Sequence, residues 1–107
     1  GIRNEAGMPT VRLKVNRWLC QGPSLELTSP GGASISAPEG ETILGMVRRL
    51  AAEDPGLWKA ILDEKTQEIR PNVLVTLNGC LVNPYDRSEA LLKEGDEVLL
   101  LPNFDGG

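Results

Sequence analysis

Gly106 and Gly107, the last two residues of the sequence, are the residues best suited to chemistry on another molecule. Glycine has no side chain, so two glycines form a thin and flexible stalk. A carboxylate at the end of such a stalk can pass through a narrow tunnel into the active site of a partner protein. Chain termini are also commonly disordered, so the residues before the pair decide whether it has a function.

The other residue types exclude several classes of catalytic site. Histidine is absent, which excludes Ser-His and Cys-His nucleophile pairs. Cys20 and Cys80 are the only cysteines, and they lack the spacing of a zinc or redox motif. Cys80 lies in a strand-and-turn pattern, which favours a buried, inert thiol. We therefore predict that the chain is not itself an enzyme and binds no metal or cofactor. Two unpaired thiols favour a cytoplasmic location.

Composition favours a single domain that works with protein partners. The net charge is −4, with 15 acidic and 11 basic residues, whereas a nucleic-acid binder normally carries a basic patch. No apolar run is long enough to span a membrane. We predict one domain over residues 8–107. Residues 1–7 lack the apolar core of a secretory signal. We interpret them as residues left from an expression tag or as a disordered N-terminus.

Strand and helix patterns alternate along the first half of the chain. Apolar residues at every second position predict strands at residues 11–15, 25–27 and 33–37, so that residues 20–40 form a long, decorated hairpin. The apolar spacing then changes to that of a helix over residues 43–51, with Thr42 or Glu41 at its start. Asp54 and Pro55 end this helix and start a second one, and we expect Trp58 in the core.

The C-terminal third predicts the strands that lead to the diglycine. Residues 73–77 alternate as a strand, and Asn78-Gly79 is a strong hairpin-turn signal. Residues 98–101 are four consecutive apolar residues, which predicts a central strand buried on both faces and adjacent to the first strand. Pro102 is expected to stop this strand. Residues 102–107 would then form a flexible tail that reaches about 20 Å.

These patterns together resemble the MoaD/ThiS family of ubiquitin-like sulfur carriers. The resemblance rests on four motifs: Val75-Thr76-Leu77-Asn78-Gly79, Leu92-Lys93-Glu94-Gly95-Asp96-Glu97-Val98, Leu101-Pro102 and Gly106-Gly107. The strand, proline and diglycine ending looks most like the small subunit of molybdopterin synthase. The resemblance implies an α+β, ubiquitin-like β-grasp fold: a mixed sheet of four to five strands, with one main helix, broken near Pro55, packed on one face.

The resemblance also implies a function. A ubiquitin-activating-type adenylyltransferase would use its own Mg-ATP to adenylate Gly107, and a persulfide donor would convert it to a thiocarboxylate. The large subunit of molybdopterin synthase, or another sulfur-accepting enzyme, would receive the sulfur. Gly106, Asp105, Phe104 and Pro102 would form the tail that contacts the partner. Phe104 is either an anchor in a partner pocket or a core side chain, and Asp105 requires a compensating cation on the partner.

Several alternatives share the same activation chemistry. The carrier could serve thiamine synthesis, tRNA thiolation or amino-acid biosynthesis. The chain could also be a ubiquitin-like protein modifier that is joined to lysines through Gly107, or an interaction module with an idle tail. The sequence has no phosphate-binding glycine loop followed by Lys-Ser/Thr, so we expect the ATP to bind to the partner. Ordering the tail costs conformational entropy, which predicts an apolar docking patch on the sheet.

Overall fold

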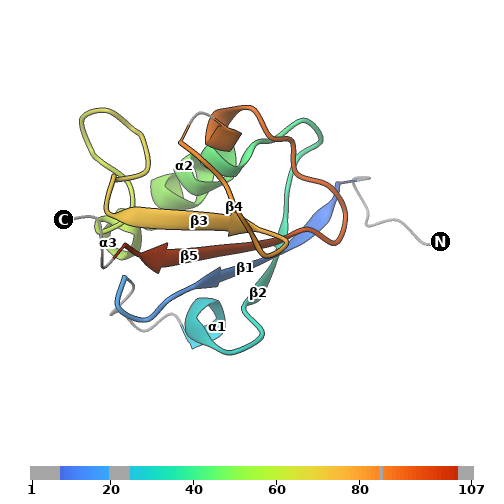
Figure 1. Ribbon diagram of the computed structural model, residues 1–107, viewed down its shortest axis with the longest axis horizontal. Coiled ribbons are helices and arrows are strands. Elements are labelled where there is room, and N and C mark those ends of the chain that lie inside the picture. The colour runs from blue at the N-terminus through green and yellow to red at the C-terminus, as the bar shows by residue number, and fades with distance from the viewer. Residues whose placement is uncertain (1–7, 20–24, 85, 104–107) are drawn as a thin grey trace.

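The computed structural model describes residues 8–19, 25–84 and 86–103, which build a five-stranded mixed sheet with one main helix packed on one face (Figure 1). The strands are β1 (Thr10–Val15), β2 (Ala33–Ser36), β3 (Val73–Leu77), β4 (Cys80–Leu81) and β5 (Glu97–Pro102). Their order in the sheet is β2-β1-β5-β3-β4, with β1 and β5 parallel and the other neighbours antiparallel. The prediction that the first and last strands are central neighbours is therefore confirmed.

The helices follow the capping signals of the sequence. They are α1 (Leu25–Thr28), α2 (Ile43–Glu53), α3 (Pro55–Trp58) and the 3-10 helix η1 (Asp86–Ser88). The Thr42 hydroxyl accepts the Gly45 amide at 3.1 Å and starts α2. The Asp54 carboxylate accepts the Leu57 amide at 3.2 Å and starts α3, with Pro55 at its first position. The predicted break near Pro55 is confirmed.

One hydrophobic core fills the space between the inner face of the sheet and α2. Alternate residues of β1, β3 and β5 point into it, and Ile43, Met46 and Val47 meet them from α2. Trp58 is 2% exposed and belongs to this core, as predicted. None of the helices in the described part of the chain has the length and apolar character that crossing a membrane requires.

Between β1 and β2 the structure differs from the prediction. Residues 25–28 form the short helix α1, so the predicted strand at residues 25–27 is wrong. Two apolar positions are too few to establish a strand period, and the Ser29 amide and hydroxyl both donate to the Glu26 carbonyl, which closes a helical turn. β2 pairs with β1 only from Thr10 to Leu13. Helix α1 contacts β1 and buries Leu27 against the core.

The burial of β5 also corrects the sequence interpretation. Val98 and Leu100 are buried against the core, but Leu99 and Leu101 on the opposite face are only partly buried. Among the described residues, the helix α2 covers one face of the sheet and no comparable element covers the other. The run of four apolar residues therefore marks a central strand, but not one buried on both faces.

Candidate functional site

The end of β5 fixes the place from which the diglycine segment leaves the fold. β5 includes Pro102, and the Asn103 amide donates to the Asn72 carbonyl at 2.8 Å. Hydrogen-bonded and non-hydrogen-bonded pairs alternate along antiparallel strands, so the next pair, Val73 with Pro102, is a non-hydrogen-bonded one. The Pro102 nitrogen therefore faces away from β3, and its missing N–H costs the sheet no bond there.

This pairing corrects the prediction that Pro102 stops the strand. Pro102 and Asn103 are held against β3, so the first two residues of the predicted tail belong to the end of the central strand. Phe104, Asp105, Gly106 and Gly107 lie outside the described residues. Four residues of the sequence follow Asn103, and their greatest reach is about 14 Å, rather than the 20 Å expected for six residues.

A buried arginine holds the strand opposite Pro102. The Arg87 side chain comes from η1, is 7% exposed, and donates from Nη2 to the Val73 carbonyl at 2.9 Å. Its Nε has no hydrogen-bond partner in the described part of the chain, and burial lowers the pKa of the guanidinium. Sequence reasoning missed Arg87 because an arginine in a polar, turn-rich segment gives no sign that it folds inward.

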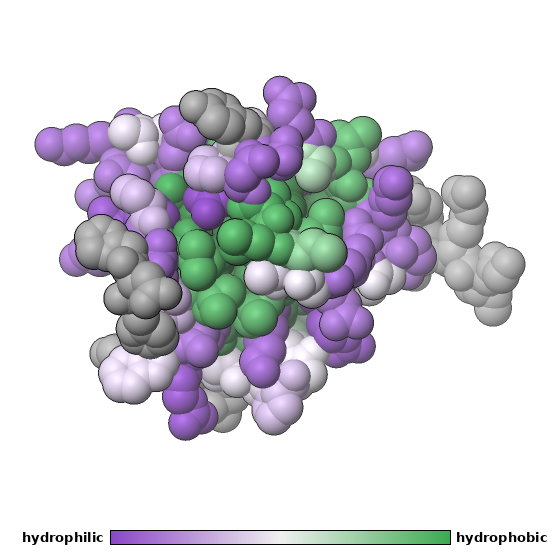
Figure 2. Space-filling model, viewed as in Figure 1, coloured by the Kyte–Doolittle hydropathy of each residue, from purple (hydrophilic) through white to green (hydrophobic). Residues whose placement is uncertain are grey.

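The open face of the sheet carries four leucines that we call the leucine strip: Leu74, Leu81, Leu99 and Leu101. Leu74 is paired with Leu101, and Thr76 lies between Leu99 and Leu81. Leu81 is 66% exposed, and the other three are partly buried. Figure 2 shows apolar side chains gathered on this face over β3 and β5. The strip ends beside Pro102, where the diglycine segment leaves the sheet.

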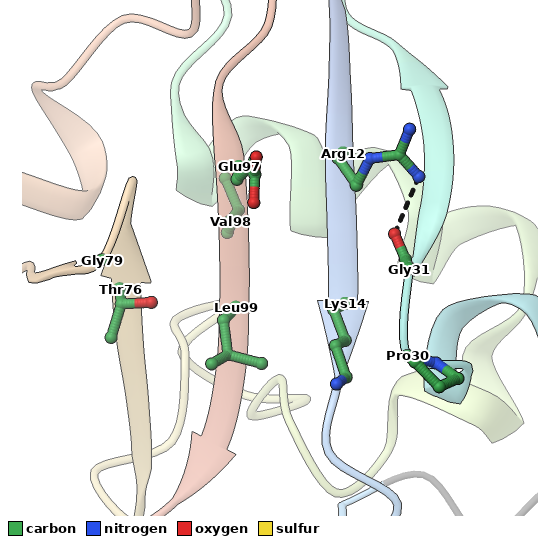
Figure 3. A pocket seen from close by; sticks show the side chains of 9 residues that line it. All are labelled: Arg12, Lys14, Pro30, Gly31, Thr76, Gly79, Glu97, Val98 and Leu99. Carbon is green, nitrogen blue, oxygen red and sulfur yellow. Dashed lines mark hydrogen bonds between the residues drawn. The ribbon is translucent and has the colours of Figure 1, made fainter.

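A groove runs beside the leucine strip between β5 and the segment that precedes β2. Its volume is about 300 Å³, and Arg12, Lys14, Glu97 and Leu99 line it. Pro30 and Gly31 form its outer wall, and Arg12 Nη1 donates to the Gly31 carbonyl at 2.8 Å (Figure 3). A second groove, of about 430 Å³, lies between α2 and α3 and contains no residue of the leucine strip.

The described residues contain little else that suggests catalysis. Cys80 is exposed on β4, so the prediction of a buried thiol is wrong; the two-residue strand lies at the sheet edge, where nothing packs over it. Cys20 lies outside the described residues. Within the described ranges, no group of three or more His, Cys, Asp or Glu side chains is arranged to hold a metal ion.

Comparison with known proteins identifies the family. A model described as the ThiS family matches residues 22–107. The chain belongs to the ThiS family. The predicted resemblance to the MoaD/ThiS family of ubiquitin-like sulfur carriers is thereby confirmed. No match was found among curated proteins.

Solved structures confirm the ubiquitin-like β-grasp fold of this ThiS-family protein. The Haloferax volcanii HVO 2177 protein has 23% identity and a TM-score of 0.70, with 100% of this chain and 94% of that chain covered. Small archaeal modifier protein 1 from Methanosarcina acetivorans has 24% identity and a TM-score of 0.63, with coverage of 94% and 98%. Urm1 from Trypanosoma brucei has 21% identity and a TM-score of 0.59, with coverage of 99% and 100%.

Proposed function

We propose that this ThiS-family protein carries sulfur as a thiocarboxylate on Gly107, for the assembly of molybdopterin. The observation that supports this proposal most directly is the junction at Asn103. There the central strand ends in a sheet bond, the leucine strip lies uncovered beside it, and the sequence continues for four residues to Gly107. A rigid body with an apolar face next to a short glycine-ended segment suits delivery of a carboxylate to a partner.

The chemistry begins with activation, because a carboxylate is a poor acyl donor. A carboxylate oxygen of Gly107 attacks the α-phosphorus of ATP bound with Mg²⁺ on an adenylyltransferase, and pyrophosphate leaves. A sulfur nucleophile then attacks the carbonyl carbon, and AMP departs. With hydrosulfide as the nucleophile, the product is the thiocarboxylate directly. In the cell we propose a persulfide donor, whose attack gives an acyl disulfide; a second thiol then attacks the donor's sulfur, which releases the thiocarboxylate and leaves a disulfide between the donor and that thiol. Gly106 keeps the segment slim, and a cation on the partner balances Asp105.

The leucine strip is the proposed docking surface for the partners. Ordering the four residues beyond Asn103 costs about 4–8 kcal/mol, at 1–2 kcal/mol per residue. Burial of apolar surface contributes about 25 cal/mol per Å², so offsetting 6 kcal/mol requires about 240 Å² of newly buried apolar area. Because the remaining reach is only about 14 Å, the partner's active site must lie close to Leu74 and Leu101.

Two proteins receive this segment in the proposed cycle. The first is a ubiquitin-activating-type adenylyltransferase, and the second is the large subunit of molybdopterin synthase. The choice of molybdopterin follows from the strand, proline and diglycine ending, which resembles the small subunit of that enzyme. Phe104 is proposed to seat in a pocket of the partner and orient the segment, since aromatic anchors commonly dominate such contacts.

Intact-mass spectrometry tests the proposal. The protein is incubated with the adenylyltransferase of its source organism, Mg-ATP and sulfide, and we expect a mass gain that corresponds to one oxygen replaced by sulfur. A variant that lacks Gly106 and Gly107 is the control and stays unchanged. The absence of the gain in the full chain contradicts the carrier function. Conjugates joined through Gly107 to lysines in a cell extract, without that gain, indicate a protein modifier instead.

A further inference from the structure

The groove between β5 and the Pro30-Gly31 wall is built into the fold. The guanidinium of Arg12 holds the wall through the Gly31 carbonyl at 2.8 Å (Figure 3). The next residue, Gly32, has a φ of 70° and lies so close to β1 that a Cβ there would meet the Leu13 carbonyl oxygen at 2.6 Å. The wall is therefore fixed to the same strand that supplies the groove's floor.

Besides Arg12, which holds the wall through the Gly31 carbonyl, two opposite charges line this groove, those of Lys14 and Glu97. No hydrogen bond or ion pair joins the Lys14 amine or the Glu97 carboxylate to another residue in ranges 8–19, 25–84 and 86–103. In the parallel pairing of β1 with β5, Arg12 is opposite Glu97 and Lys14 is opposite Leu99. Glu97 and Lys14 are thus two residue steps apart along the strands, or about 7 Å.

The order of these charges gives the groove a direction. β1 and β5 both run toward the end at which Pro102 lies, so Lys14 is nearer to that end than Glu97. The lysine is drawn in Figure 3 with its amine directed toward the same end. Leu99, which belongs to the leucine strip, lies opposite Lys14 and lines the same groove. A partner that approached in the reverse orientation would bring like charges together, which is unfavourable.

We infer that this groove (Figure 3) receives an acidic side chain of the adenylyltransferase, which binds Lys14, and a basic side chain farther from Pro102, which binds Glu97. The inference rests on the proposed function, because it concerns the protein that receives Gly107 first. Binding of both charges fixes the direction in which the sheet docks on the adenylyltransferase. Four residues reach only about 14 Å, so Gly107 meets the bound ATP only when the sheet docks in one direction.

Charge reversal at Lys14 tests the inference in an ATP–pyrophosphate exchange assay with the adenylyltransferase of the source organism. We expect Lys14→Glu to raise the KM for the carrier by about tenfold or more, because attraction becomes repulsion at the interface, and to change kcat by less than about twofold. Lys65→Glu is the matched control. Lys65 is exposed, whereas Lys14 is half-buried, and it undergoes the same charge change without lining the groove, so the KM of Lys65→Glu stays near the wild-type value.

A carbodiimide cross-link provides a second measurement, since it joins an amine directly to a contacting carboxylate. We expect Lys14 to be joined to an Asp or Glu of the adenylyltransferase. Reversing the charge of that acidic residue is expected to restore the KM of Lys14→Glu. Equal KM values for Lys14→Glu and Lys65→Glu, or cross-links that never include Lys14, overturn the inference while leaving the carrier function intact. Absence of exchange with the wild-type chain overturns the proposed function itself, and the inference with it.

Discussion

Replacement of Gly32 by alanine is expected to destabilise the fold more than any other single-methyl addition at a glycine with positive φ in the described chain. Gly32 has a φ of 70°, a region that disfavours residues with a Cβ. An ideal Cβ at this position would lie 2.6 Å from the Leu13 carbonyl oxygen and 3.1 Å from its carbonyl carbon. Both atoms belong to the backbone of β1, so neither can move without disturbing the sheet.

The size of the effect follows from two separate contributions. A positive φ costs an alanine about 1–2 kcal/mol, and the stiffer unfolded chain returns about 0.4–1 kcal/mol. The clash adds to this cost, because a carbon and a carbonyl oxygen normally stay at least about 3.3 Å apart. Moving β1 and the Gly32 segment apart weakens one or two hydrogen bonds between β1 and β2, at about 1 kcal/mol each. The total is about 2 kcal/mol.

Gly40→Ala is the matched control. Gly40 has a φ of 86°, but a Cβ there would meet nothing within 4 Å, so this variant has the backbone strain without the clash. We expect a loss of about 1 kcal/mol for Gly40→Ala and about 2 kcal/mol for Gly32→Ala in urea unfolding. The melting temperature should fall by about 5 °C and about 10 °C, respectively. Equal losses in the two variants would refute the close approach of Gly32 to β1.

Three further variants test other parts of the structure. Thr42→Ala removes the cap of α2 and should lower the free energy of unfolding by about 1 kcal/mol in urea titration, with Thr42→Ser close to wild type; equal losses in both would contradict a capping role. Arg87→Ala removes the buried donor to the Val73 carbonyl and should cost about 1–3 kcal/mol, with faster amide exchange at Asn103 by NMR; unchanged exchange would show that Arg87 does not support the end of β5. The Thr66 and Lys65 amides lower the pKa of Asp63, so its carboxylate stabilises the fold above the ordinary value of 3.8 and loses this effect as the pH falls through the lowered pKa. Asp63→Asn should therefore be less stable than wild type near neutral pH, and the gap should narrow in acid; a gap independent of pH would refute this.

The sequence alone determined the local features of the protein. Thr42, Asp54 and Pro55 set the helix boundaries, because capping depends on neighbouring residues in the chain. The alternation in residues 73–77 set the two faces of β3 for the same reason, since successive side chains point to opposite sides of a strand. The C-terminal motifs were sufficient to predict the family, which the match over residues 22–107 confirmed.

Only the tertiary structure decided what covers each surface. The run of apolar residues before Pro102 looks the same in the sequence whether its strand is buried on one face or on both. Because α2 packs on only one face of the sheet, Leu99 and Leu101 on the other face are only partly buried. Arg87 became buried through its contact with the start of β3, far away in sequence. Pro102 remained within β5 because the alternation of hydrogen-bonded pairs turned its nitrogen away from β3. Each outcome depends on contacts between distant segments, which a pattern of neighbouring residues does not contain.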